Sequence, residues 1–202
     1  MTMDKVKSAP VMHKRDLLVE AAAHALEEQA VEGLTVRDVA RRAQQSTIGI
    51  YRHFAGKDGL LDALFRRGFA QLGEAARAAG EREASPRAAV LATAAEYLAL
   101  ATSQPQHYRL MFAPESAGFT PDGEARAHLL DNYANWVALV ARLPLPPGED
   151  RRVAADLFAL VHGHVALRAQ GYGPPAAPEE WTQRILSSVE RQLDMLTGTA
   201  GT

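Results

Sequence analysis

The chain has 202 residues, with 22 Lys and Arg against 24 Asp and Glu, and no cysteine. Its apolar fraction of 47% and charged fraction of 23% are typical of a globular protein and exclude a disordered or collagen-like chain. The lack of cysteine excludes disulfides, thiolate metal sites and a cysteine nucleophile. There is neither an apolar run of membrane-spanning length nor an apolar secretion signal, so we expect a cytoplasmic protein without a membrane partner.

The charge is unevenly distributed along the chain. The formal net charge of −2 argues at first sight against nucleic acid as a partner. Residues 33–57, however, carry a net charge of +4, against −2 for residues 1–32 and −4 for residues 58–202. A short basic segment of this kind is typical of a surface that binds phosphate, and a solvated helical face is the alternative.

Apolar residues recur at helical spacing almost throughout, and no alternating β pattern of useful length occurs. Capping residues mark several expected helix starts, such as Thr35 with Asp38, Ser46, Ser85 before Pro86, and Thr120 before Pro121. The sequence predicts an all-α protein of about nine helices, near residues 11–31, 36–43, 46–53, 57–72 and beyond, 86–103, 105–113, 122–142, 150–170 and 179–196. We expect a small domain at residues 1–56 and a larger helical domain at residues 57–202.

The three short helices before residue 57, with basic residues on the second and third, favour a helix-turn-helix. Thr47 and Gly49 fall on the first turn of the third helix, where base edges would be contacted. Tyr51 and His53 follow at positions able to donate to phosphates, and Lys57 begins a helix whose dipole favours an anion. For Tyr51 the alternative is a core aromatic residue, and for His53 a surface histidine without a role.

These segments resemble the DNA-binding domain of TetR-type transcriptional regulators. The resemblance lies in residues 34–43, in Ser-Thr-Ile-Gly-Ile-Tyr-Arg-His-Phe at 46–54 and in Lys-Asp-Gly-Leu-Leu at 57–61. It implies that Arg37, Thr47 and Gly49 lie near bases and that phosphates are bound by Thr35, Tyr51, His53 and Lys57, with Ser46 and Ile48 completing the site.

This chain departs from the family at two places in the same domain. Gln44-Gln45 replaces the usual Gly-Val at the turn, and a non-glycine residue with positive φ is disfavoured by about 1 kcal/mol. Ile48 replaces a small residue, and its branched side chain would offer an apolar contact to a base.

The C-terminal part is similar to a subgroup named for a Trp-His-Gly motif. Residues 104–112 match its central segment, and His162-Gly163 matches its motif with Val161 in place of tryptophan. The family's larger domain binds a ligand and dimerises, which implies a small, mostly apolar or aromatic effector. The candidate pocket residues are Tyr97, Leu100, Tyr108, Met111, Phe112, Trp136, Leu139, Phe158 and His162.

The last two expected helices would pair with those of a second copy. The candidate interface residues are Val153, Leu157, His164, Trp181, Ile185, Val189, Leu193 and Leu196. For both candidate sets the alternative is ordinary monomer core. Such a homodimer would align its two DNA-binding domains on a palindromic operator of double-stranded DNA.

Other kinds of site find little support in the sequence. His162 and His164 are two residues apart on a helix, so their side chains diverge and cannot bind one metal ion. Neither a phosphate-binding glycine loop nor a nucleophile motif occurs, so we expect no cofactor, no metal and no enzymatic activity. We therefore predict a ligand-responsive repressor. The alternatives are a small helical enzyme or carrier, and an activator or ligand-insensitive DNA-binding protein.

Overall fold

The computed structural model describes residues 13–172 and 176–198. These residues form nine α-helices and one short 3₁₀-helix, and they contain no strand, so the predicted all-α fold is confirmed. The predicted start of the first helix, at residues 11 and 12, lies outside the described residues. The chain divides into two compact units, Met1–Leu64 and Phe65–Thr202. Among the described helices, none combines the length and the apolar character needed to cross a membrane.

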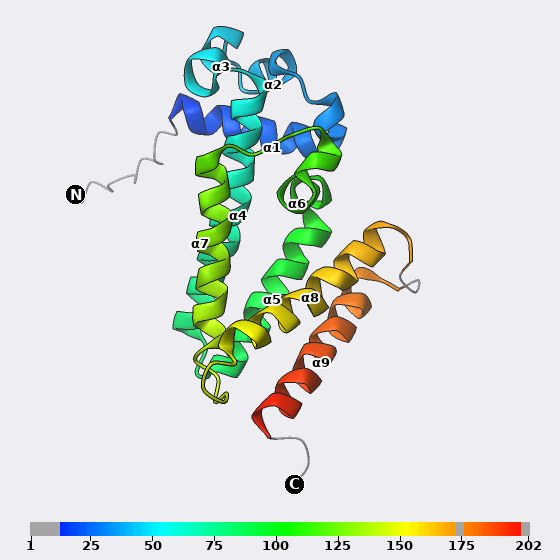
Figure 1. The fold of residues 1–202 in the computed structure, drawn as a ribbon. Coiled ribbons are helices and arrows are strands. Elements are labelled where there is room, and N and C mark those ends of the chain that lie inside the picture. The colour runs from blue at the N-terminus through cyan, green and yellow to red at the C-terminus, as the bar shows by residue number, and fades with distance from the viewer. Residues whose placement is uncertain (1–12, 173–175, 199–202) are drawn as a thin grey trace, which may run out of the picture. The chain divides into compact units, whose positions relative to one another are not determined.

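The first unit contains α1 (Lys14–Gly33), α2 (Val36–Arg42), α3 (Thr47–Phe54) and the beginning of α4 (Lys57–Arg82) (Figure 1). Helix α2 packs against both α1 and α3. The interior is apolar and draws on all four helices; its fully buried members include Leu18, Leu26, Val39, Ile50, Leu60 and Leu64. Because the first turns of α4 supply this core, the unit extends beyond residue 56, where the sequence suggested a boundary.

The expected caps of the short helices are largely present. The Thr35 hydroxyl accepts a hydrogen bond from the Asp38 amide at 3.2 Å, and Ser85 caps α5 by accepting one from Ala88 at 3.2 Å. Ser46 stands at the N-cap of α3, but its side chain makes no capping hydrogen bond. Helix α1 is interrupted near its end, where Ala30 has φ 56°.

The second unit contains the rest of α4 and five further α-helices. They are α5 (Pro86–Ser103), α6 (Pro105–Phe112), α7 (Gly123–Val140), α8 (Asp150–Ala169) and α9 (Pro178–Thr197), with a 3₁₀-helix at Pro114–Ala117. Helix α5 packs against α6, α7, α8 and α9, while α8 and α9 lie side by side (Figure 1). Helix α7 begins later than the Thr120-Pro121 pair suggested, because Asp122 is its cap and accepts a hydrogen bond from the Ala125 amide at 2.7 Å.

Candidate nucleic-acid interface and ligand cavity

Helix α3 presents one side to the interior and the other to solvent. Ile50 and Phe54 are buried, whereas Ile48 and Tyr51 are 76% and 61% exposed. Arg52 is also exposed on this outer side. The exposure of Tyr51 excludes the alternative that its ring belongs to the core.

The predicted DNA-contact residues all belong to the first unit, at α3 and at the starts of α2 and α4. The exposed members are Thr35, Arg37, Ser46, Ile48, Tyr51 and His53. The half-buried members are Thr47, Gly49 and Lys57. None of the nine is buried, so each has surface available to a partner.

Two arginines of the basic segment are already paired within the protein. Arg42 donates to Asp38 at 2.6 Å and to Glu28 at 2.7 Å, and Arg41 forms an ion pair with the same Asp38. Gln29 also donates to Asp38, at 2.8 Å. Hydrogen bonds from Arg42, Gln29 and Arg41 lower the pKa of Asp38 to about 2. The carboxylate of Asp38 therefore joins α1 to α2, and the basic segment has less unpaired charge than its sequence suggests.

Lys57 has a partner that its sequence position did not reveal. Its ammonium donates to the carbonyl oxygen of Val31 at 2.7 Å, close to the interruption of α1 at Ala30. A lysine ammonium has three N–H donors, so this hydrogen bond leaves capacity for a phosphate. Lys57 thus also ties the end of α1 to the start of α4.

The turn between α2 and α3 has the backbone conformation that the family's glycine implied. Gln44 has φ 53°, in the left-handed region that glycine adopts most easily. The Gln44 and Gln45 amides still close the turn, donating to Arg41 at 3.2 Å and to Ala40 at 2.9 Å. The usual turn therefore forms without glycine, with local backbone strain.

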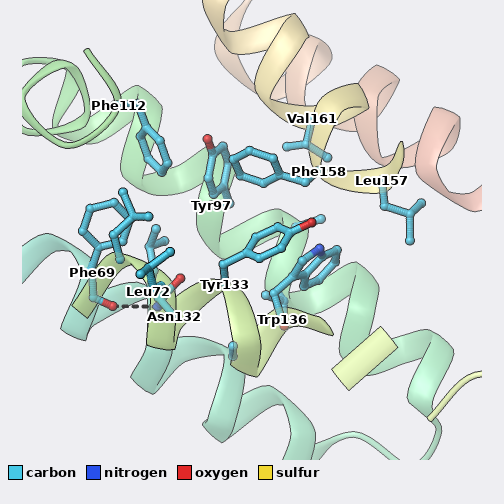
Figure 2. Close-up of a pocket in the computed structure, with 15 residues that line it drawn as sticks. Phe69, Leu72, Tyr97, Phe112, Asn132, Tyr133, Trp136, Leu157, Phe158 and Val161 are labelled. Atoms are coloured by element: carbon cyan, nitrogen blue, oxygen red, sulfur yellow. Dashed lines mark hydrogen bonds between the residues drawn. The ribbon is translucent and has the colours of Figure 1, made fainter. Parts of the chain in front are cut away.

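The second unit contains an apolar cavity of about 330 Å³ that is partly open to solvent. It lies between side chains of α4, α5, α6, α7 and α8, and Figure 2 shows Tyr133 and Trp136 of α7 facing Leu157 and Phe158 of α8. The lining consists of Phe69, Leu72, Ala76, Thr93, Ala94, Tyr97, Phe112, Leu129, Leu130, Asn132, Tyr133, Trp136, Leu157, Phe158 and Val161. None of these 15 described residues carries a charge.

Four of the nine predicted pocket residues line this cavity, namely Tyr97, Phe112, Trp136 and Phe158. Leu100, Met111 and Leu139 are buried elsewhere in the core. Tyr108 and His162 do not line the cavity but hydrogen-bond to Tyr97, which does. The prediction did not include the cavity-lining residues of α4 or most of those of α7. The spacing of Leu129, Tyr133 and Trp136 on one face of α7 was a signal that could have indicated them.

Tyr97, Tyr108 and His162 form a closed polar cluster. The Tyr97 hydroxyl lies 2.8 Å from that of Tyr108, and His162 Nδ1 lies 2.9 and 2.7 Å from the Tyr97 and Tyr108 hydroxyls. Burial raises the pKa of Tyr97 and raises that of Tyr108 to about 12, so both stay neutral. Burial also lowers the pKa of His162, which favours its neutral imidazole.

Most polar groups of the cavity wall are already engaged with backbone atoms. Trp136 Nε1 donates to Ala154 at 2.9 Å, Thr93 donates to Ala89 at 2.8 Å, and Asn132 donates to Phe69 at 2.8 Å (Figure 2). Tyr133 has no hydrogen-bond partner among the described residues, so its hydroxyl is available to a ligand. The wall can therefore offer an apolar surface with a single hydroxyl and the Asn132 carbonyl oxygen.

Most predicted interface residues face the interior of their own chain. Six of them are almost completely buried from solvent, namely Val153, Leu157, Trp181, Ile185, Val189 and Leu193. His164 and Leu196 are half-buried. The guanidinium of Arg168 lies 4.7 Å above the Trp181 ring, which holds α8 and α9 together within one chain. A second copy can therefore reach only the other face of these helices.

The described residues contain no group of three or more His, Asp or Glu side chains arranged to hold a metal ion.

Both units resemble known regulators. Residues 18–64 match the family described as bacterial regulatory proteins, tetR family, and residues 90–189 match the family described as tetracyclin repressor-like, C-terminal domain.

Individual proteins are similar over most of the chain. The HTH-type transcriptional regulator BetI of Paraburkholderia phytofirmans is 32% identical over 171 residues, covering 80% of this chain and 84% of that protein. A solved structure of unknown function from Rhodococcus sp. RHA1 is 27% identical with a TM-score of 0.73, covering 94% and 98% of the two chains. FadR from Bacillus subtilis in complex with stearoyl-CoA shares the fold, with 13% identity, a TM-score of 0.64 and coverage of 90% and 97%.

Proposed function

The chain belongs to the TetR family of bacterial transcriptional regulators, and on this premise we propose that it is a repressor released from DNA by a small molecule. It binds a palindromic operator as a homodimer in the cytoplasm and has no catalytic role. The observation that carries this proposal is the outer side of α3, where Ile48 and Tyr51 project from a polar and basic surface.

The roles of the DNA-contact residues follow from their positions. Thr47, Ile48 and Gly49 occupy the first turn of α3, which in a helix-turn-helix contacts base edges in the major groove. Tyr51 and His53 carry exposed donors further along α3, suited to phosphates. Thr35 and Arg37 stand at the start of α2, and Ser46 retains a hydroxyl unused by the α3 cap. Lys57 adds a phosphate contact while it keeps its hydrogen bond to the Val31 carbonyl oxygen.

Dimerisation uses the outward face of α8, together with α9. Leu160, Gly163, His164 and Leu167 recur at intervals of three and four residues, and none of them is buried. Leu167 is 51% exposed, and a Cβ added at Gly163 would meet no atom within 4 Å. An apolar, shallow stripe of this kind suits a self-complementary contact between two copies.

The effector is small, neutral and mostly apolar or aromatic. The cavity of about 330 Å³ is within the range of small-molecule sites, and its lining carries no charge to balance an ionised group. FadR from Bacillus subtilis holds stearoyl-CoA, whose phosphates would need cations that this lining lacks. Here the cavity suits an acyl chain or an aromatic ring, with Tyr133 bonding one neutral polar group.

Helix α4 contributes residues both to the DNA-binding unit and to the effector cavity. Leu60 and Leu64 at its start belong to the core of the first unit, whereas Phe69, Leu72 and Ala76 line the cavity. An effector that favours a non-binding arrangement of the two DNA-binding domains by about 3 kcal/mol would lower operator affinity about 150-fold.

Selection of bound duplexes from a random DNA pool, with and without candidate apolar metabolites, tests the proposal. We expect a palindromic sequence to be enriched, and an effector to reduce its recovery. Absence of any enriched duplex at low salt would overturn sequence-specific binding and favour the alternative of a helical carrier. A palindrome that no metabolite releases would instead favour a ligand-insensitive DNA-binding protein.

A further inference from the structure

Ile48 occupies the part of α3 that lies furthest from the interior. Successive residues of an α-helix are rotated by about 100°, so Ile48 and the buried Ile50 point to nearly opposite sides. Arg52, one turn after Ile48, is exposed on the same side. The outermost ridge of α3 therefore carries one apolar and one cationic side chain.

Nothing within the described part of the chain accounts for an isoleucine at this place. Its side chain is 76% exposed, and a β-branched residue is not a strong helix former. A single exposed apolar residue is common on protein surfaces and is not by itself a site. The argument needs a second observation from the same turn.

Gly49 provides that observation. A Cβ added there would have only the Cδ1 atom of Leu18 within 4 Å, at 4.0 Å, which is an ordinary contact. Its backbone is helical, and alanine would stabilise a helix by about 1 kcal/mol over glycine. Because no other described atom lies within 4 Å, the place of the missing side chain is nearly open, on the same turn of α3 as Ile48.

The major groove of DNA offers one apolar group to such a side chain, the C5 methyl of thymine. Apart from the smaller C5–H of cytosine, the groups that distinguish the bases on this edge are hydrogen-bond donors or acceptors, which an isoleucine cannot satisfy. We propose that Ile48 recognises a thymine methyl group in each operator half-site, with Gly49 allowing that base to approach α3. This inference rests on the proposed function, because it specifies how the operator is distinguished from other DNA.

The expected size of the effect follows from burial of one methyl group. A buried methyl contributes enough to change affinity about fourfold. A palindromic operator has two equivalent thymines, so loss of both methyl groups should weaken binding by about 15-fold.

Deoxyuridine substitution in the selected operator tests this directly, since it removes only the methyl group. Each symmetric pair of thymines is replaced in turn, and the affinity of the full-length protein is measured. We expect one pair to weaken binding about 15-fold and the others less than about twofold. Placing 5-methylcytosine, paired with guanine, at that position should restore part of the affinity lost with unmethylated cytosine.

Two variants connect the effect to the side chain. Ile48→Ala, checked for unchanged helical content by circular dichroism, should bind more weakly and show no dependence on that methyl pair. Tyr51→Phe, which lacks only the exposed hydroxyl, should bind more weakly and keep the dependence of the wild type. If no thymine pair matters, or if Ile48→Ala keeps the dependence, the inference is overturned while the proposed function stands. If no operator is enriched at all, both are overturned.

Discussion

Replacing Gly49 by alanine should make the protein more stable and a weaker DNA binder. The added methyl group would contact only the Leu18 side chain, at 4.0 Å, so no described atom has to move. Alanine is favoured over glycine inside a helix by about 0.8–1.0 kcal/mol. We therefore expect the free energy of unfolding to rise by about 1 kcal/mol and Tm by about 2–4 °C for a chain of this length.

The same methyl group stands on the first turn of α3, beside Ile48. A base contact displaced there is worth about 1–3 kcal/mol, so affinity for the selected duplex should fall about 5- to 150-fold. A gain in stability with a loss of binding would separate a functional reason for this glycine from a structural one.

Denaturant unfolding followed by circular dichroism measures the first effect, and fluorescence anisotropy with labelled duplex measures the second. Gly123→Ala is the control, since a Cβ there meets no atom within 4 Å and the residue stands at the start of α7, away from α3 in the sequence. The control should leave DNA affinity unchanged. An alanine at 49 that stabilises the fold and binds DNA as tightly as glycine would refute the reasoning.

Three further changes test other parts of the structure. Gly59→Ala should destabilise the protein by about 1–3 kcal/mol in thermal melts, because its Cβ would overlap the Phe54 carbonyl oxygen. Unchanged stability would contradict the backbone geometry between α3 and α4. Leu167→Glu should convert the dimer to a monomer in analytical ultracentrifugation, whereas Leu130→Glu, at a still more exposed position on α7, should not; two dimeric variants would exclude the proposed α8 face. The pKa of His162 is lowered in the folded state, so the unfolded chain takes up a proton first and stability should fall as the pH drops below about 6.5. His162→Gln should lack this component of the decline, measured by denaturant unfolding between about pH 7.5 and 5.5, and a decline equal to that of the wild type would place the titration elsewhere.

The first unit was largely predictable because its signals are local. The Thr35 cap is formed within four residues, and the outer side of α3 follows from the spacing of Ile50 and Phe54. The pairing of Arg42 was not predictable, since its partner Glu28 lies on another helix and only packing brings them together. The same holds for Lys57 and the carbonyl of Val31.

The second unit was harder to predict because helix α8 is apolar on both sides. Val153, Leu157, Val161 and Val165 form its buried stripe, whereas Leu160 and Leu167 belong to the outward one. Periodicity identifies both stripes but cannot say which faces the core. Of the predicted interface residues on α8, Val153 and Leu157 lie in the buried stripe and His164 in the outward one.

The cavity shows the same limit of sequence reasoning. Phe112 and Met111 are neighbours with similar apolar character, yet Phe112 lines the cavity and Met111 is packed in the core. The difference depends on which facing helix leaves space, and that is decided by tertiary packing.

The most direct test of the proposed function is the affinity of the full-length protein for its selected palindrome over a range of salt concentrations. Phosphate contacts release counterions, so two copies of α3 on DNA should give a linear, steep fall of log affinity with log salt. We predict a loss of at least about a hundredfold between about 50 and 200 mM salt, and much weaker binding to a scrambled duplex of equal length. Equal affinity for both duplexes, or affinity independent of salt, would contradict operator recognition by α3.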